Sequence, residues 1–168
     1  NVAIQVAEQM SDYLLTGAVT NALNMPSVSA EDAPKLMPYM KLAEQLGSFA
    51  GQVTESALKK EKVEYCGQAS DLNTKPLTAV VLQGLLSPLL ESVNMVSAPA
   101  IAKERNIEIT ESTCDTLDEF QTIVRLTVTT EKQVRSVAGT LAHGNKPRLI
   151  EIKDIAIDAE LGADMLYI

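Results

Sequence analysis

The residue types that most often carry out catalysis are scarce in this sequence. His143 is the only histidine among the 168 residues, so it is the only candidate base for a Ser-His-Asp arrangement. It lies in the turn-forming segment 143–145, where side chains are usually exposed to solvent. The eight glycines include no GxG pair and no GK[ST] sequence occurs, so loops of the kind that bind nucleotide phosphates are missing. We assign no catalytic residue and no cofactor-binding residue to this chain.

The sequence also gives little support for metal binding or for catalysis by paired carboxylates. Cys66, Cys114 and His143 do not have the spacing of a tetrahedral metal site, and free cysteines commonly serve as small buried residues. The acidic segment 115–119 contains several carboxylates, but at a turn before a strand they are more simply solvated. We therefore predict no metal site.

One group of basic residues could bind an anion. Lys146, Arg148 and Lys153 surround a predicted strand, and Arg148 shares its parity with the apolar Ile150 and Ile152. The Arg148 guanidinium would then emerge at the rim of a buried surface, where an arginine can hold a phosphate or carboxylate in a forked geometry. The alternative is an arginine that only covers the core with its aliphatic stem. Both interpretations stay open at this point.

The composition sets limits on the class of protein. A length of 168 residues, 46% hydrophobic and 21% charged, is typical of one folded domain with a substantial core. A net charge of −8 argues against nucleic acid and anionic membrane surfaces as partners. No apolar run is long enough to span a membrane. Cys66 and Cys114 lie far apart in the sequence, which predicts reduced cysteines and a cytoplasmic protein.

Three helices are predicted in the first half of the chain. Residues 2–23 have an apolar stripe so wide that two sides need covering, as in a core helix or a helix that docks on something else. After a linker at 24–30, Asp32 is expected to cap a second helix, and the charged run 59–62 is expected to be a solvated face before a strand at 63–66. Thr74 and Pro76 open a third, largely buried helix that Gly84 and Pro88 should weaken or kink. 

The second half of the chain begins with a short helix and continues as strands. Ser97 is expected to cap the helix and Asn106 to end it in the left-handed conformation, before a strand at 107–110. Because helices separate this strand from the one near residue 63, the two should pair in parallel. Alternating strands follow from residue 119, with segments 134–141, 148–153 and 155–159 separated by turns. We predict an α+β fold in which the N-terminal helices pack on a mixed sheet that ends in an antiparallel meander.

Three segments together resemble long-form D-3-phosphoglycerate dehydrogenases. Residues 5–26 look like the helix and linker that leave the catalytic part of those enzymes. Residues 93–107, VNMVSAPAIAKERNI, resemble the signature of their intervening domain. The pieces VAGTL at 137–141 and PRLIEI at 147–152 resemble its closing hairpins. The matches occur in the family's order and cover nearly the whole chain.

The resemblance implies a part of a larger enzyme. The family oxidises 3-phosphoglycerate to 3-phosphohydroxypyruvate with NAD at the start of serine biosynthesis, and its NAD loop and catalytic residues belong to upstream domains without a match here. The chain alone is therefore expected to be inactive and to hold no cofactor. We expect residues 1–26 to be the linker helix, 27–164 the intervening, allosteric substrate-binding domain, and 165–168 the start of a missing ACT domain.

The resemblance also implies partners for this chain, and alternative functions stay open. The partners would be the catalytic and ACT domains of the parent and further copies in a homo-oligomer. Some family members bind an anion with several basic side chains on the last hairpin, but here that hairpin, 155–160, is apolar and acidic, and only Arg148 keeps a basic match. The domain could instead be a structural spacer that mediates oligomerisation and carries the ACT domain. A piece of an iron–sulfur L-serine dehydratase is a further alternative, against which the missing cluster cysteines speak.

Overall fold

The structure is a computed structural model that describes residues 2–16, 28–29, 31–115, 120–143 and 145–162. Four of the sequence-based predictions fall partly or wholly outside these residues. They are the end of the first helix at 17–23, most of the linker 24–30, most of the acidic segment 115–119, and the strand 165–168.

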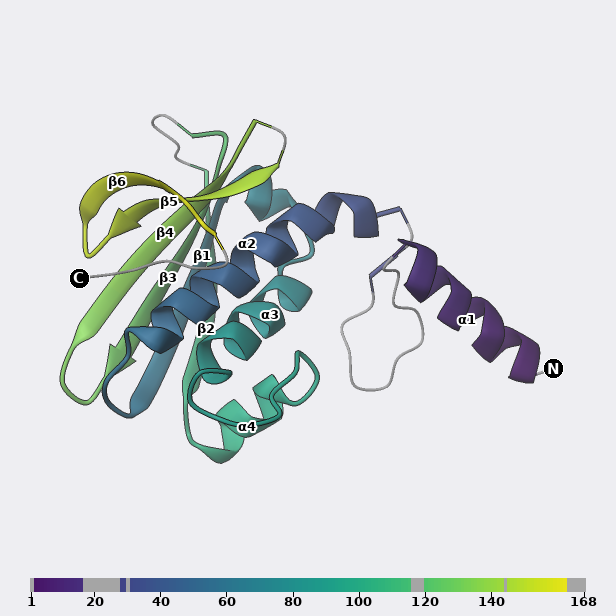
Figure 1. Cartoon of the computed structure of the whole chain (residues 1–168), viewed down its shortest axis with the longest axis horizontal. Helices are drawn as coiled ribbons and strands as arrows, with labels where there is room; N and C mark the ends of the chain where they lie inside the picture. Colours follow the sequence, from purple (N-terminus) through teal and green to yellow (C-terminus); the bar gives the residue numbers. More distant parts are fainter. Residues whose placement is uncertain (1, 17–27, 30, 116–119, 144, 163–168) are drawn as a thin grey trace.

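Helices come first and strands last, as predicted (Figure 1). The helices are α1 (Val2–Thr16), α2 (Ala33–Gln52), α3 (Thr74–Leu86) and α4 (Ala98–Glu104), with a short 3₁₀ helix, η1 (Gln68–Asp71). The strands are β1 (Leu58–Gly67), β2 (Glu108–Cys114), β3 (Thr122–Thr130), β4 (Val134–Ala142), β5 (Lys146–Ile152) and β6 (Ile155–Glu160). The strands β1 and β2 are longer than the sequence indicated, because both continue into polar residues.

The strands form one mixed, six-stranded sheet in the order β2-β1-β3-β4-β5-β6. The strands β1 and β2 pair in parallel, and the segment between them contains α3 and α4. Every other neighbouring pair is antiparallel, so β3 to β6 form the predicted meander. The α+β class, the parallel pair and the meander are all confirmed.

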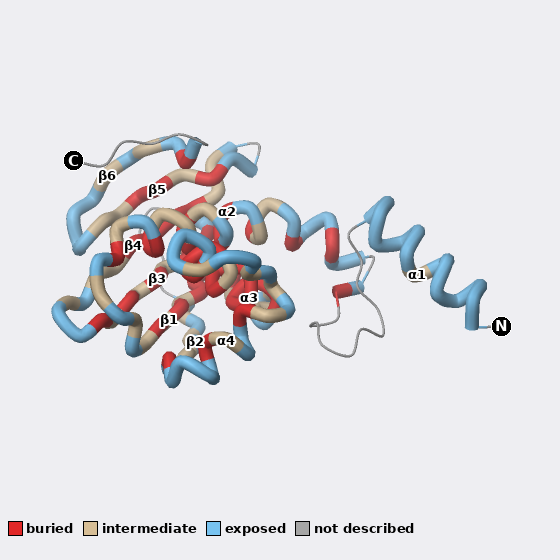
Figure 2. The backbone as a smooth tube through the Cα atoms, turned by 60° about the horizontal axis from the view of Figure 1, so that its bottom comes forward, coloured by how far each residue is buried: buried red, intermediate tan, exposed pale blue. Residues whose placement is uncertain are grey.

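The core lies between the sheet and two helices. In Figure 1, α2 and α3 run side by side across one face of the sheet, and α4 lies beyond α3. Figure 2 shows the buried residues gathered between these helices and the strands. On the sheet side the core contains the alternating side chains Val124, Leu126 and Val128 of β3, in agreement with the predicted alternation from residue 119. Phe120 precedes β3 and is exposed.

The two central helices approach each other closely because glycines replace side chains at their contact. A Cβ atom on Gly47 of α2 would collide with the Val81 carbonyl oxygen of α3. A Cβ atom on Gly84 of α3 would lie 2.5 Å from the Glu44 carbonyl oxygen of α2. The helix α3 runs through Gly84 and ends at Leu86, so this glycine allows a close helix contact at the cost of some helix propensity.

Hydrogen bonds fix both ends of α4, and one of them differs from the prediction. At the start, Ser97 occupies the N-cap position, but its side chain makes no capping hydrogen bond to the helix. Asn94 holds the turn before the helix instead, because its Oδ1 accepts hydrogen bonds from the backbone N–H groups of Val96 and Ser97, each at 2.9 Å. At the end, Asn106 has φ 56°, as predicted. The Ile107 N–H donates to the Ala102 carbonyl at 2.8 Å and the Asn106 N–H to Lys103 at 3.1 Å, which together form a Schellman motif.

The expected cap of α2 also differs. Asp32 occupies the N-cap position, but its side chain makes no capping hydrogen bond to the helix. It accepts instead a hydrogen bond from the Ser29 hydroxyl at 2.6 Å, while that hydroxyl accepts one from the Asp32 N–H at 3.0 Å. The carboxylate is therefore used to hold the turn before the helix.

The helix α1 lies apart from this core. None of its residues is buried, and Figure 2 shows it exposed along its length. Its apolar side chains are among the most exposed in the described chain, including Val2 at 75%, Leu14 at 77% and Leu15 at 81%. Within the described residues, no helix combines the length and apolar character needed to cross a membrane.

The prediction of two reduced cysteines is wrong for this structure. Cys66 and Cys114 stand opposite each other in the parallel register of β1 and β2, with Cα atoms 4.6 Å apart, and form a disulfide. The sequence separation of 48 residues concealed this proximity, because only the crossover through α3 and α4 brings the two strand ends together. The bridge fastens β2, an edge strand, to its neighbour β1.

Removal of the disulfide should destabilise the chain. A loop of 48 residues gives an entropic contribution of about 4 kcal/mol, and measured values are typically about 2 to 4 kcal/mol. We expect Cys114→Ala to lower the free energy of unfolding by that amount in urea titrations, and a thiol reductant to do the same to the wild-type chain. The matched control is the neighbouring Thr113→Ala, which should change stability little. Identical unfolding of wild type with and without reductant would contradict the structural role of the bridge.

Candidate functional site

The structure places Arg148 on the face of the sheet opposite to the one predicted. Leu149 is 1% exposed and pairs with Gly139, whose face is packed by α2 side chains. The register then shifts between Leu149 and Glu151, so a β-bulge interrupts the alternation of β5. Ile152 packs on the core after the bulge, whereas Arg148, before it, points away from the helices. The expectation that Arg148 shares the apolar face of Ile152 is therefore wrong.

Two carboxylates flank the Arg148 guanidinium on this outer face. Its Nε donates a hydrogen bond of 2.6 Å to Asp158 Oδ1, and Glu160 is its partner in the register of β5 and β6. The hydrogen bond to Asp158 raises the pKa of Arg148, and the charges of Asp158 and Glu160 act in the same direction. One of the five guanidinium donors is thus engaged by Asp158, whose side chain is 72% exposed.

The other two predicted residues do not join Arg148. Lys146 is the exposed first residue of β5, and Lys153 follows the last residue of that strand in a turn with φ 50°. Lys146 and Lys153 therefore lie at opposite ends of β5, which at about 3.3 Å per residue places their backbones roughly 20 Å apart along the strand. The structure therefore does not gather Lys146, Arg148 and Lys153 into one rim.

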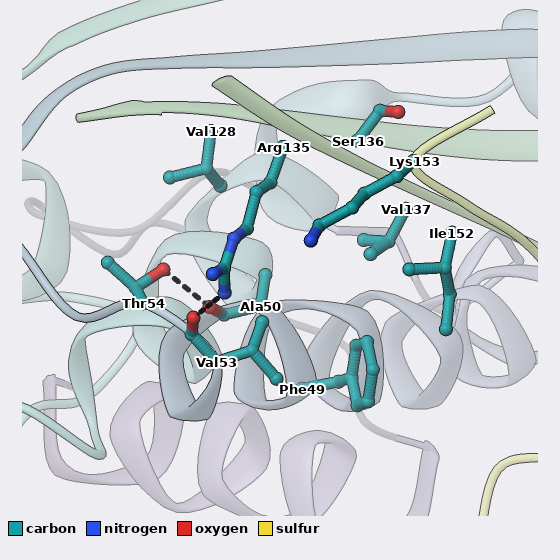
Figure 3. A pocket seen from close by; sticks show the side chains of 10 residues that line it. All are labelled: Phe49, Ala50, Val53, Thr54, Val128, Arg135, Ser136, Val137, Ile152 and Lys153. Carbon is teal, nitrogen blue, oxygen red and sulfur yellow. Dashed lines mark hydrogen bonds between the residues drawn. The ribbon is translucent and has the colours of Figure 1, made fainter. Parts of the chain in front are cut away.

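Lys153 instead lines a small hollow on the helix side of the sheet. Figure 3 shows its amine and the Arg135 guanidinium directed into this space beside the end of α2. Arg135 Nη1 donates to the carbonyl of Val53, the residue that ends α2, which is a favourable place for a cation because the helix dipole is negative there. The cavity holds only about 10 Å³, enough for about one water molecule. We infer that these two cations stabilise the C-terminal end of α2.

The outer face of the sheet carries further ion pairs. Arg125 of β3 and Glu151 of β5 form a two-fold hydrogen-bonded pair with distances of 3.2 and 3.1 Å. On β1, Lys62 Nζ lies 2.9 Å from Glu64 Oε1. Within the part of the chain that the structure describes, no three His, Cys, Asp or Glu side chains are grouped as a metal ion would require. This face is polar, and several of its charged side chains are paired with each other.

Glu61 is the titratable residue that the sequence interpretation missed. It is 0% exposed, and neither carboxylate oxygen has a hydrogen-bond partner among the described residues. Burial, with a smaller contribution from the charge of Glu111, raises its pKa from 4.5 to about 8. Nearby, the Tyr65 hydroxyl and the Thr78 hydroxyl are joined by a 2.7 Å hydrogen bond. The prediction that the charged run 59–62 is a solvated face is thus wrong for Glu61. The sequence did contain a signal, because Glu61 alternates in phase with the apolar Val63 and Tyr65 and should therefore face the core with them.

The comparisons with known proteins identify one family. Residues 35–153 match the model of the D-3-phosphoglycerate dehydrogenase intervening domain. The chain is 36% identical over 148 residues to the D-3-phosphoglycerate dehydrogenase of Methanocaldococcus jannaschii, which covers 88% of the chain and 28% of that protein. It is 32% identical to the enzyme of Synechocystis, over 99% of the chain and 30% of the relative. Against the enzyme of Bacillus subtilis the identity is 28%, over 100% of the chain and 32% of the relative. The chain therefore spans about 30% of the length of these relatives.

The buried carboxyl group of Glu61 should make stability depend on pH. Its pKa of about 8 lies above the ordinary 4.5, so the folded chain keeps a proton that the unfolded chain has released. The contribution of Glu61 to the free energy of unfolding should therefore be highest below pH 4.5. It should fall as the pH rises and level off above about pH 8. The largest slope is about 1.4 kcal/mol per pH unit.

The substitution Glu61→Gln tests this dependence. It keeps the shape of the side chain and removes the titrating group, so the difference in unfolding free energy between variant and wild type should grow in favour of the variant from pH 5 to pH 8. Urea titrations at several pH values measure it. Glu104→Gln, at an exposed position of α4, is the control and should follow the wild-type profile. Parallel profiles for wild type and Glu61→Gln would contradict the assigned pKa.

Proposed function

The chain belongs to the D-3-phosphoglycerate dehydrogenase intervening-domain family, and from this membership we propose that it is a non-catalytic regulatory and interaction module of such an enzyme. The observation that carries the proposal is that the family match covers residues 35–153 while whole relatives are about three times longer. The parent would oxidise 3-phosphoglycerate with NAD in the cytoplasm, and its NAD site would lie outside this chain. The fold is compatible with this division of labour, since Arg125 and Arg148 on the outer face of the sheet are each paired with a carboxylate.

The domain limits proposed here are those that the sequence resemblance implied, and the family match at residues 35–153 lies within the central one. Residues 1–26 would be the connection from the catalytic part, 27–164 the intervening domain, and 165–168 the beginning of an ACT domain. The exposure of every described residue of α1 except Gln9 supports a connecting or docking role for that helix. The partners would be the catalytic and ACT domains and further copies of the chain.

Regulation by a small phosphorylated anion is the finer part of the proposal. Its site would be Arg148, on β5 beside the last hairpin, where Asp158 already holds Nε and an arriving phosphate would bind next to this carboxylate. Glu160 opposes an anion at the same place through its charge. This pairing favours the second candidate function, a structural spacer that mediates oligomerisation and carries the ACT domain without binding a ligand.

A titration with inorganic phosphate and 3-phosphoglycerate separates these two functions. For a ligand site we expect saturable but weak binding by the wild-type chain, with Kd on the order of 1 mM, equivalent to about −4 kcal/mol. Binding should be lost in Arg148→Ala and strengthened in Asp158→Asn, which frees the guanidinium. Lys35→Ala, which removes a charge at the exposed start of α2, should bind as wild type does. Identical titration curves for all four proteins would leave only the spacer.

The helix α1 predicts self-association of the chain. Met10 is 61% and Leu14 77% exposed on a stripe with Ala7, and apolar surfaces of this kind are usually covered by a partner. In the parent this partner can be the catalytic part; without it, we expect a homodimer built on α1. Light scattering should show the dimer for wild type, a shift toward monomer for Leu14→Gln, and no shift for the control Asp12→Asn, at an exposed position on the opposite side of the helix. A monomeric wild-type chain at high concentration would contradict the prediction.

A further inference from the structure

A groove on the side of the fold away from Arg148 has the features of a ligand site. It is formed where the loop from α2 to β1, the chain after α3 and the end of α4 meet, and its volume is about 540 Å³. This volume falls within the range of about 300 to 1,000 Å³ that is usual for small-molecule sites. All residues that line it belong to the described part of the chain.

The floor of the groove is apolar. Leu86 is 1% and Ile107 7% exposed, and both belong to the small core cluster that joins α3 to α4. Leu58 and Leu90 are partly buried against the same cluster. The exposed remainder of these side chains, with Leu89 at 44%, offers an aliphatic surface. Such a floor favours a ligand with a hydrocarbon body.

The rim of the groove carries charges of both signs, and one of its cations, Arg105, has no partner among the described residues. Arg105 and Lys59 stand on it against one carboxylate, Glu55. Lys59 is held 2.9 Å from Glu131, which leaves two of its three donors. Among the described residues the guanidinium of Arg105 makes no hydrogen bond or ion pair, so its forked donors are available to an anion.

One observation indicates a prepared site. The Schellman motif at the end of α4 fixes the backbone of Arg105 and Ile107, so the cation and part of the apolar floor have a set geometry. The groove is therefore both complementary in charge and largely preformed.

We propose that this groove binds a small amphipathic organic anion, one carboxylate joined to an aliphatic body, with the carboxylate on Arg105 and the body against Leu86, Leu90 and Ile107. The proposal does not depend on the function proposed above, since Arg148 and the parent enzyme take no part in it. A mineral anion lacks the body and a neutral lipid lacks the charge, so neither matches both halves of the groove.

Octanoate is a suitable probe, followed by amide chemical shifts of the 168-residue chain. We expect saturable shifts at the groove, at Ser56, Leu90 and Ile107, and much weaker binding of inorganic phosphate or of octanol. Arg105→Gln should weaken octanoate binding about tenfold, equivalent to about 1.4 kcal/mol. Leu90→Gln should also weaken octanoate binding, because it makes the apolar floor of the groove more polar. Lys103→Gln removes the same charge from an exposed position of α4 outside the groove and should change Kd less than twofold.

Three results would overturn the proposal. They are equal octanoate affinity in wild type and Arg105→Gln, phosphate binding as tight as octanoate binding, and octanoate shifts located elsewhere on the chain. Arg105 is exposed, so its substitution should leave the fold and its unfolding temperature unchanged, and a loss of binding can then be ascribed to the groove. A failure of the Arg148 titration would leave these measurements unaffected.

Discussion

The contact between α2 and α3 is the constraint on which the rest of the arrangement depends. Gly47, Gly51 and Gly84 have no room for a Cβ atom, so the two backbones touch. Only at this separation do both helices fit on one face of the sheet and close the core, because larger side chains would push them apart and open a cavity. The position of α3 in turn determines where α4 and the following strand β2 run. The parallel pair, the disulfide and the groove all follow from that path.

Charge is distributed according to the two faces of the sheet. On the outer face, acids and bases pair with each other, as in Arg125 with Glu151 and Arg148 with Asp158. Exposed pairs of this kind add little stability, so their main effect is to keep that face soluble and to occupy its cations. On the helix side, Glu61 lacks such a partner and stays protonated over much of the ordinary pH range. Arg105, whose guanidinium has no partner among the described residues, lies at neither face but at the end of α4.

The chain covers about 30% of the length of relatives that are enzymes. Its described residues form one sheet with α2 and α3 packed on one face. The exposed apolar stripe of α1 is a surface of the kind that a partner usually covers.

The sequence alone determined the element order, the mixed sheet, the buried third helix and the left-handed Asn106, because these depend on local periodicity and on residues with special backbone preferences. It also carried the family resemblance, since that rests on ordered residue matches. Tertiary structure decided the rest. The disulfide required a register between strands 48 residues apart, and the face of Arg148 changed with a β-bulge that alternation does not reveal. The charge run 59–62 was assigned to solvent because charges usually lie there, whereas the position of Glu61 within the pairing of β1, β2 and β3 buried it. The groove combines three segments distant in sequence, so no local pattern could have indicated it.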